Sequence, residues 1–469
     1  SVSPEVVNLK SDSYREKYNQ HLLHPWGDLS SLGHDDSSSI IDKGEGVYVY
    51  DSEGNRLLDG PAGMWCMQTG YGRTEIAEAV AAQILNLSYS TSFSLVNRRE
   101  VELAERIASQ TPGDLNRVFF TTGGSTAVDS ALRLCQLARN IRGEPDRKHI
   151  LTREKAYHGS TYLSASVTGK ERDKTAMDTI SENVHFLSAP CFYYHSQYET
   201  EASFCDFLIR ELEEKIAEVG ANNIMCFIAE PILASGGVIV PPADYHKRCW
   251  ETIKSHGITY IADEVVTGFG RLGHWFASEA VFGIIPDIII FAKGLTSGYV
   301  PLGGYAVSDS FMEKISGENS DGCLYSNGYT WSGNPVACAA ALASWDILEK
   351  EKLFDNVQTL GPYFQAQLQT LRDNPLVGDV RGMGLMAAVE MTISGKNEAD
   401  LLEKDYAIGE LVDKHCQELG LLVRPFINIC IISPPLIINK GQINDLVGAL
   451  RIGLQRTLEE LREAEIWID

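Results

Sequence analysis

The chain has 469 residues, of which 44% are hydrophobic and 22% charged, and its formal net charge is −23 at pH 7. This length exceeds one ordinary core, so two or three domains of roughly 150 residues are predicted. The acidity argues against nucleic acid or an anionic membrane as a partner, because both require a basic face. No apolar run approaches the roughly 18 residues of a membrane span, and the polar start lacks the regions of a signal peptide. We therefore expect a cytoplasmic protein.

The 10 cysteines are scattered, without any Cys-x-x-Cys pair. Cys135, Cys226 and Cys338 fall within apolar helix or strand patterns, where cysteine behaves as a small hydrophobic residue. This usage favours a reducing compartment, and no metal site is predicted.

The N-terminal part contains a predicted β-hairpin. Residues 46–59 form two short strand-like runs around an acidic turn that contains Gly54. We expect residues 1–70 to be an N-terminal segment that packs with the C-terminal domain.

From about Arg117 onward, strands alternate with helices. Two predicted strands, residues 258–263 and 287–292, are continuous apolar runs, which is typical of central strands in a parallel sheet. This rhythm predicts an α/β fold with a mostly parallel, doubly wound sheet in a large domain over residues 71–333. The other strands are expected at residues 117–120, 149–152, 184–187 and 224–229, with a helix over about 125–142.

The alternation stops near Asn334-Pro335. Short strands are predicted around Val423 and Ile429, and the mixture of elements indicates a smaller α+β domain over residues 334–469. Its helices are expected over about 336–350, 354–372 and 405–419, and from residue 440.

An acid and a lysine end the two central strands. Asp263 follows the first run and Lys293 the second, and parallel sheets bind ligands beyond the carboxyl ends of their strands. A lysine flanked by apolar residues is partly desolvated, which lowers the pKa of its amine and favours attack on an aldehyde. A Schiff-base lysine and an aspartate on the pyridine nitrogen are what pyridoxal phosphate (PLP) requires. The alternative is a solvated lysine and an Asp263-Glu264 pair that caps a helix.

Two further segments are candidates for the same site. Residues 121–127, Thr-Thr-Gly-Gly-Ser-Thr-Ala, connect a strand to a helix, where backbone N–H groups and a hydroxyl could receive a phosphate. Tyr157 lies on a loop after a strand and could cover a pyridine face. Taken alone, the first segment could be an ordinary glycine loop capped by Ser125, and the tyrosine could simply be packing.

A nicotinamide-dependent dehydrogenase is the alternative from a different chemistry. Residues 268–273, Gly-Phe-Gly-Arg-Leu-Gly, fit the G-x-G-x-x-G pattern, and Asp287 follows at a plausible spacing. In that fingerprint the acid should end a strand, whereas Asp287 begins one. The position of Asp287 therefore argues against a nicotinamide cofactor, and we favour PLP.

Six motifs together resemble the class III (omega) aminotransferases of fold type I, in the family's order and over nearly the whole chain. They are Thr-Thr-Gly-Gly-Ser-Thr-Ala from 121, Tyr-His-Gly from 157, Ala-Glu-Pro from 229, Asp-Glu-Val-Val-Thr-Gly-Phe-Gly-Arg from 263, Ala-Lys-Gly from 292 and Thr-Trp-Ser-Gly-Asn-Pro from 330. The resemblance implies a homodimer, with each active site at the subunit interface and PLP held on Lys293. It leaves open whether dimers pair into tetramers.

The resemblance also implies a set of cofactor-binding residues. Gly124 and Ser125 would bind the phosphate, together with Thr330 from the neighbouring subunit. The remaining residues surround the ring: Asp263 at its nitrogen, Tyr157 and Val265 on its two faces, Glu230 near its hydroxyl, and His158 of the Tyr-His-Gly motif. One departure concerns the phosphate loop, which in this family resembles Ser-Gly-Ser-Glu-Ala-Asn and here is Gly-Gly-Ser-Thr-Ala-Val from residue 123.

Substrate recognition is also inferred from the resemblance. Arg424, expected at the end of a short strand, resembles the mobile arginine that binds an acceptor carboxylate; a surface arginine is the alternative. Trp65 and Phe93 resemble aromatic residues of the amine pocket in the amine:pyruvate subgroup, beside Tyr157, although both could be core residues. The implied reaction is ping-pong transfer of an amino group from a primary amine or omega-amino acid to pyruvate. An aminomutase, racemase or decarboxylase of the same fold type is the alternative.

Overall fold

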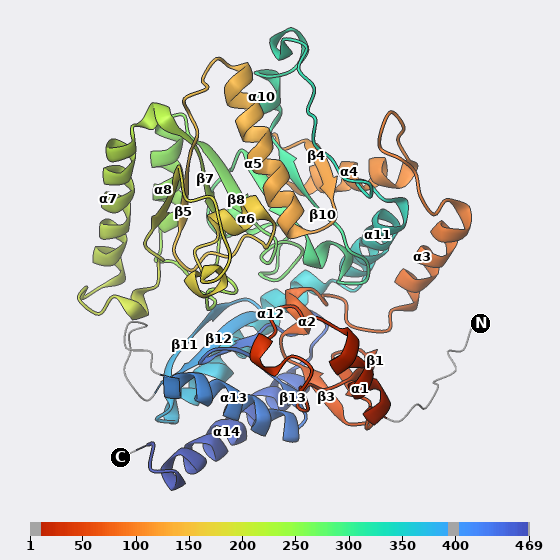
Figure 1. The fold of residues 1–469 in the computed structure, drawn as a ribbon, viewed down its shortest axis with the longest axis vertical. Coiled ribbons are helices and arrows are strands. Elements are labelled where there is room, and N and C mark those ends of the chain that lie inside the picture. The colour runs from red at the N-terminus through yellow and green to blue at the C-terminus, as the bar shows by residue number, and fades with distance from the viewer. Residues whose placement is uncertain (1–10, 393–402, 468–469) are drawn as a thin grey trace.

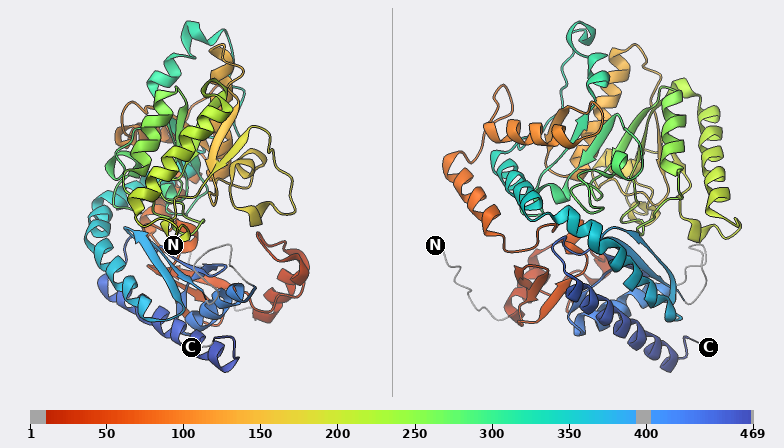
Figure 2. Two further views of the ribbon diagram at one scale, coloured as in Figure 1. Left: turned by 90° about the vertical axis from the view of Figure 1, so that its left-hand side faces the viewer. Right: turned by 180° about the vertical axis from the view of Figure 1, so that it is seen from behind.

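The computed structural model describes residues 11–392 and 403–467. A large lobe is built on a seven-stranded sheet, and a smaller lobe below it contains two four-stranded sheets (Figure 1). The same two lobes are visible from the side and from behind (Figure 2). Within the described residues, no helix is both long and apolar enough to cross a membrane.

The large sheet has the strand order β4-β10-β9-β8-β7-β5-β6. β10 is antiparallel to both of its neighbours, whereas the pairs β9-β8, β8-β7, β7-β5 and β5-β6 are parallel. The mostly parallel sheet confirms the predicted α/β class, although β10 was not predicted. The bounds are β4 (Arg117–Thr121), β5 (His149–Arg153), β6 (Val184–Leu187), β7 (Ile224–Ala229), β8 (Thr259–Asp263), β9 (Ile288–Phe291) and β10 (Gly303–Val307).

The central strands are buried on both faces. In β8, Tyr260 and Ala262 join the core that includes residues of α7 (Glu201–Val219) and α8 (Tyr245–Ser255), whereas Ile261 joins the core that includes α5 (Gly124–Ile141). Successive side chains of a strand point to opposite faces, so a strand between two cores is apolar at every position. This is why the runs that end at Asp263 and Lys293 show no alternation.

Further helices surround the large sheet. α11 packs against α3 and α4, which places the residues after Asn334 in contact with the large lobe as well as the small one. These and the remaining helices are α3 (Thr74–Asn86), α4 (Arg98–Gln110), α6 (Tyr162–Val167), α9 (Ala277–Ala280), α10 (Asp309–Glu313) and α11 (Pro335–Lys350).

The small lobe combines strands from the N-terminal and C-terminal parts of the chain. β3 (Arg56–Asp59) pairs in parallel with β13 (Leu421–Leu422), so the N-terminal hairpin of β2 (Tyr48–Asp51) and β3 lies beside a C-terminal strand. β1 (Ile41–Glu45) completes this sheet. The division at residues 70 and 333 stays a prediction. The other small sheet has the order β11-β12-β15-β14, formed by β11 (Val377–Met383), β12 (Met386–Met391), β14 (Arg424–Phe426) and β15 (Ile429–Ile432).

The small lobe also contains three long helices and two short ones. α12, α13 and α14 contact one another and the strands β11, β12, β13 and β14. The five are α1 (Ser11–His21), α2 (Ala62–Trp65), α12 (Leu353–Gln369), α13 (Glu403–Glu418) and α14 (Lys440–Glu463).

The expected position of Arg424 at the end of a strand is wrong. The chain leaves one small sheet after β13, and Arg424 begins β14, which pairs with β15 in the other sheet. Val423 lies between the two strands and is buried. The apolar run at residues 421–423 is therefore a crossing between two sheets rather than one continuous strand.

Candidate active site

Lys293 and Asp263 lie at the carboxyl ends of neighbouring strands. Asp263 is the last residue of β8 and faces Ile290 of β9 in the strand pairing, and Lys293 follows β9 in a short 3-10 turn with a left-handed φ of 47°. The Lys293 ammonium donates a hydrogen bond to the carbonyl oxygen of Met64 at 3.1 Å. Burial lowers the pKa of the Lys293 amine. The amine is thus a partly desolvated nucleophile, as the sequence predicts.

Asp263 forms a buried pair with His158. Nδ1 of His158 lies 2.6 Å from Oδ2 of Asp263, and the backbone N–H of Val265 donates to Oδ1 at 3.1 Å. Among the described residues, Nε2 of His158 is buried without a hydrogen-bond partner. The histidine fixes the direction of the carboxylate, which remains at the wall of a cavity.

The start of α5 forms one end of this cavity. Gly124 begins the helix directly after β4, and a Cβ atom built on it would lie 3.3 Å from Cγ1 of Val265. Oγ of Ser125 accepts a hydrogen bond from the backbone N–H of Ser160 at 3.0 Å. A helix N-terminus with a hydroxyl beside it is suited to an anion such as phosphate.

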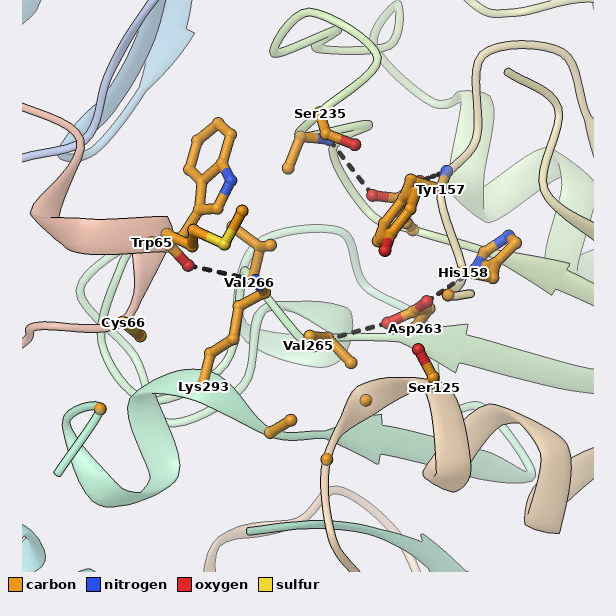
Figure 3. A pocket seen from close by; sticks show the side chains of 18 of the residues that line it. Trp65, Cys66, Ser125, Tyr157, His158, Ser235, Asp263, Val265, Val266 and Lys293 are labelled. Atoms are coloured by element: carbon orange, nitrogen blue, oxygen red, sulfur yellow. Dashed lines mark hydrogen bonds and ion pairs between the residues drawn. The ribbon is translucent and has the colours of Figure 1, made fainter. Parts of the chain in front are cut away.

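Glu230 connects the end of β7 to the Tyr157 loop. Its carboxylate accepts hydrogen bonds from the backbone N–H groups of Tyr157, at 3.0 Å, and Ala234, at 3.2 Å. Burial raises the pKa of Glu230 to about 7. The acid therefore holds the tyrosine loop in place, and Tyr157 lies across the cavity from Lys293 (Figure 3).

These residues line one cavity of about 520 Å³ (Figure 3). The structure brings together ten of the residues that the sequence singled out, but Phe93 and Thr330 do not line the cavity of their own chain. Phe93 is 87% exposed. The ten are Trp65, Gly124, Ser125, Tyr157, His158, Glu230, Asp263, Val265, Lys293 and Arg424.

Sequence reasoning missed several cavity residues. Trp26 comes from the N-terminal segment, Ser235 follows β7, and Lys170 and Arg172 lie in a charged loop after α6. Phe426 follows Arg424 in β14. The only signal for the loop was the run Lys-Glu-Arg-Asp-Lys from residue 170, a pattern more typical of a solvated surface.

The dinucleotide alternative is not supported. The side chain of Asp287 accepts a hydrogen bond from the backbone N–H of Tyr260 at 2.8 Å and pairs with Lys254 at 2.5 Å. Asp287 thus stabilises the start of β9. It is not among the residues that line the cavity.

The residues present fit PLP. Asp263 offers a buried carboxylate to a ring nitrogen, and Lys293 offers an amine to an aldehyde. The missing Cβ of Gly124 leaves room beside Val265, and the adjoining helix start is an anion site. Tyr157 and Val265 line the cavity with surfaces on which a ring could stack.

Comparison with known proteins agrees with this site. The family model for class III aminotransferases matches residues 30–453. The chain belongs to this family, and it is a PLP-dependent aminotransferase of fold type I.

Individual relatives cover almost the whole chain. The putrescine–pyruvate aminotransferase of Pseudomonas aeruginosa is 39% identical over 458 residues, which are 97% of this chain and 99% of that protein. A thermostable (S)-enantioselective omega-transaminase from Thermomicrobium roseum is 36% identical, with a TM-score of 0.91 over 96% of this chain and 99% of that one. A thermostable omega transaminase variant, engineered for asymmetric synthesis of enantiopure bulky amines, is 32% identical, with a TM-score of 0.91 over 96% of this chain and 100% of that one.

Proposed function

We propose that the protein transfers an amino group from a primary amine or omega-amino acid to pyruvate by a ping-pong mechanism. The observation that carries this proposal is the position of Arg424 on the wall of the cavity that holds Lys293 and Asp263. A guanidinium is suited to the carboxylate of a keto acid. The relative named putrescine–pyruvate aminotransferase supports a pairing of an amine with pyruvate.

Each polar residue of the cavity has a distinct proposed role. Bound PLP supplies an electron sink for the pair of electrons left when the substrate carbon loses its proton. Asp263, oriented by His158, holds a proton on the ring nitrogen. Lys293 removes the proton from the substrate carbon, and its lowered pKa favours the neutral amine that this step needs. Gly124 and Ser125 hold the phosphate, and Glu230 keeps Tyr157 over the ring.

Arg424 and Trp65 are the proposed substrate-recognition residues. The guanidinium of Arg424 lies 5.8 Å from the Trp65 ring, and burial lowers its pKa. In the engineered transaminase variant a Trp, a Phe and an Arg are replaced together, with the same sequence separations as those between Trp65, Phe93 and Arg424 here. Because that variant was engineered for the synthesis of bulky amines, the match supports a role for all three residues in substrate recognition.

Phe93 and Thr330 are proposed to act in the site of a second copy of the chain. Their two segments lie together, since the Tyr89 hydroxyl donates a hydrogen bond to the Thr330 carbonyl oxygen at 2.9 Å. Both segments expose large apolar side chains, including Leu85 at 88% and Trp331 at 58%. Exposed apolar side chains on neighbouring segments are typical of an interface, and a homodimer would bring the two residues to the partner's cavity.

The test is an absorbance experiment on the PLP-bound enzyme. We expect the visible band of bound PLP to bleach on addition of 1-phenylethylamine and to return on addition of pyruvate. The Lys293→Ala variant is the control, and it should show neither change. A band that amine leaves unaltered would contradict the proposed donor, and a bleached band that pyruvate does not restore would contradict the proposed acceptor.

A further inference from the structure

Two cations lie on the cavity wall next to the proposed substrate residues. Lys170 immediately precedes a 3-10 turn at residues 171–174, and Arg172 lies within that turn. Nζ of Lys170 lies 3.8 Å from the centre of the Phe426 ring and 5.6 Å from that of Tyr157. The Arg172 guanidinium lies 5.1 Å from the Phe426 ring. The ammonium of Lys170 is therefore held between the Tyr157 loop and β14.

Within the described chain, no carboxylate is in direct hydrogen-bond contact with the Lys170 ammonium, although Asp173 and Glu230 lie close enough to favour its charge. The Lys170 side chain is only 9% exposed, and its carboxylate partner among the described residues is Asp173, at 3.7 Å. That distance is too long for a direct hydrogen bond. Burial lowers the pKa of Lys170, because a desolvated position disfavours the charged form of the amine. A bound carboxylate would stabilise that charged form.

Arg424 is a second cation without a carboxylate in ion-pair contact within the described chain. Its guanidinium lies over the Trp65 ring, and Asp59 acts on it only through a longer-range electrostatic effect. Burial is the main cause of the lowered pKa of Lys170, and repulsion from Arg172 and Arg424 lowers it further. The cavity wall thus presents two cations, Lys170 beside Phe426 and Arg424 beside Trp65.

We propose that Lys170, supported by Arg172, forms a second carboxylate subsite that binds the distal carboxylate of an omega-amino acid donor. This inference rests on the proposed function and assigns Arg424 to the keto acid. The carboxylate of a keto acid is attached to the reacting carbon, whereas that of an omega-amino acid lies several bonds away. Arg424 beside Trp65 and Lys170 beside Phe426 offer one cation to each of these two carboxylates.

The subsite also predicts discrimination between donors of equal length. 4-Aminobutyrate and putrescine share a four-carbon chain and differ in the distal group, which is a carboxylate in one and an ammonium in the other. An ammonium beside Lys170 and Arg172 meets like charge, which is unfavourable in a desolvated site. Butan-1-amine has no distal charge and serves as the neutral reference.

The experiment measures kcat/KM for these three donors, with pyruvate as acceptor, in the PLP-bound enzyme. In the wild type we expect 4-aminobutyrate to exceed butan-1-amine, and putrescine to be the poorest. In Lys170→Met the ratio of 4-aminobutyrate to butan-1-amine should fall about 10-fold, the effect of losing one charged hydrogen-bond partner, while putrescine improves. Arg172→Met, at an exposed position, should lower the same ratio by a smaller factor.

Lys174→Met is the matched control from the same loop. Lys174 donates a hydrogen bond to the Thr168 carbonyl oxygen and does not line the cavity, so its removal should leave the donor ratio unchanged. An equal fall for 4-aminobutyrate and butan-1-amine in Lys170→Met, or a similar change in Lys174→Met, would overturn the subsite while the wild type still transaminates. Failure of the proposed function is distinguishable, because wild-type enzyme with bound PLP would then turn over none of the donors.

Discussion

Nδ1 of His158 lies 2.6 Å from Oδ2 of Asp263, and the two side chains are 0% and 3% exposed. A buried carboxylate needs a partner to remain in place, and the histidine provides one from a different loop of the sheet. The other oxygen of Asp263 accepts only the backbone N–H of Val265 among the described residues. Asp263 is thus fixed in direction while it remains at the cavity wall.

Asp263→Asn should retain PLP but lower kcat by roughly 100-fold or more, a size typical of groups that place a proton. The amide can still accept a hydrogen bond from His158, so the loop should keep its position. It carries no negative charge to hold a proton on the ring nitrogen. Steady-state kcat and PLP content, measured by absorbance, check this expectation. A variant with near-normal kcat would contradict the proposed role.

Glu264→Gln should affect stability instead of chemistry. Glu264 accepts hydrogen bonds from Thr267 and from the backbone N–H groups of Ala277 and Ser278, so it caps the start of α9. An amide in that position would present an N–H group to at least one N–H donor. We expect a loss of about 2 kcal/mol in the free energy of unfolding, measured in denaturant. A variant with a normal free energy of unfolding and a large loss of kcat would contradict the capping role.

The sequence predicted where Asp263 and Glu264 lie in the fold, but its local pattern did not distinguish their roles. The apolar runs before Asp263 and Lys293 predicted buried parallel strands, and the ends of such strands meet at one edge of a sheet. Local pattern could not decide which of two adjacent acids faces the ligand. The structure gives the capping role to Glu264 and the cavity position to Asp263.

Contacts between distant loops were not predictable from periodicity. Lys170 and Phe426 are far apart in sequence, and neither belongs to a long regular element. The same holds for Trp26, which reaches the cavity from the N-terminal segment. The β10 strand was missed because residues 303–307 follow a glycine-rich and proline-containing loop without a helix before them. The resemblance to a family predicted the roles of residues within its motifs, whereas contacts between distant loops depend on the tertiary fold.

Glu230→Gln should change the pH dependence of stability. Burial raises the folded-state pKa of Glu230 from 4.5 to about 7, so the folded protein binds this proton more tightly than the unfolded chain does. The stability from that proton is fully present below about pH 4.5 and is lost as the pH rises through about 7. The variant lacks this titration. We expect its melting temperature, relative to the wild type, to rise between about pH 4.5 and about pH 7 and to change little at higher pH. A difference that does not vary with pH would contradict the raised pKa.

Gly159→Ala should weaken PLP binding through Ser125. Gly159 has a φ of +142°, and a Cβ atom there would lie 2.5 Å from Oγ and 2.8 Å from Cα of Ser125, as well as 2.4 Å from Oγ of Ser164. The loop must shift, because contacts this short involve a helix backbone as well as hydroxyl groups. Ser125 stands at the proposed phosphate position, so its displacement should raise the dissociation constant for PLP by about 10-fold, or about 1.4 kcal/mol.

Gly448→Ala is the control for this substitution. Gly448 lies within α14, where an added Cβ atom meets no other atom within 4 Å, so alanine should raise helix stability by up to about 1 kcal/mol and leave PLP binding unchanged. Titration of both variants with PLP, followed by absorbance, separates the two effects. If Gly159→Ala bound PLP as tightly as Gly448→Ala, the position of Ser125 would not determine phosphate binding, and the helix start of α5 would have to hold the phosphate through its backbone N–H groups alone.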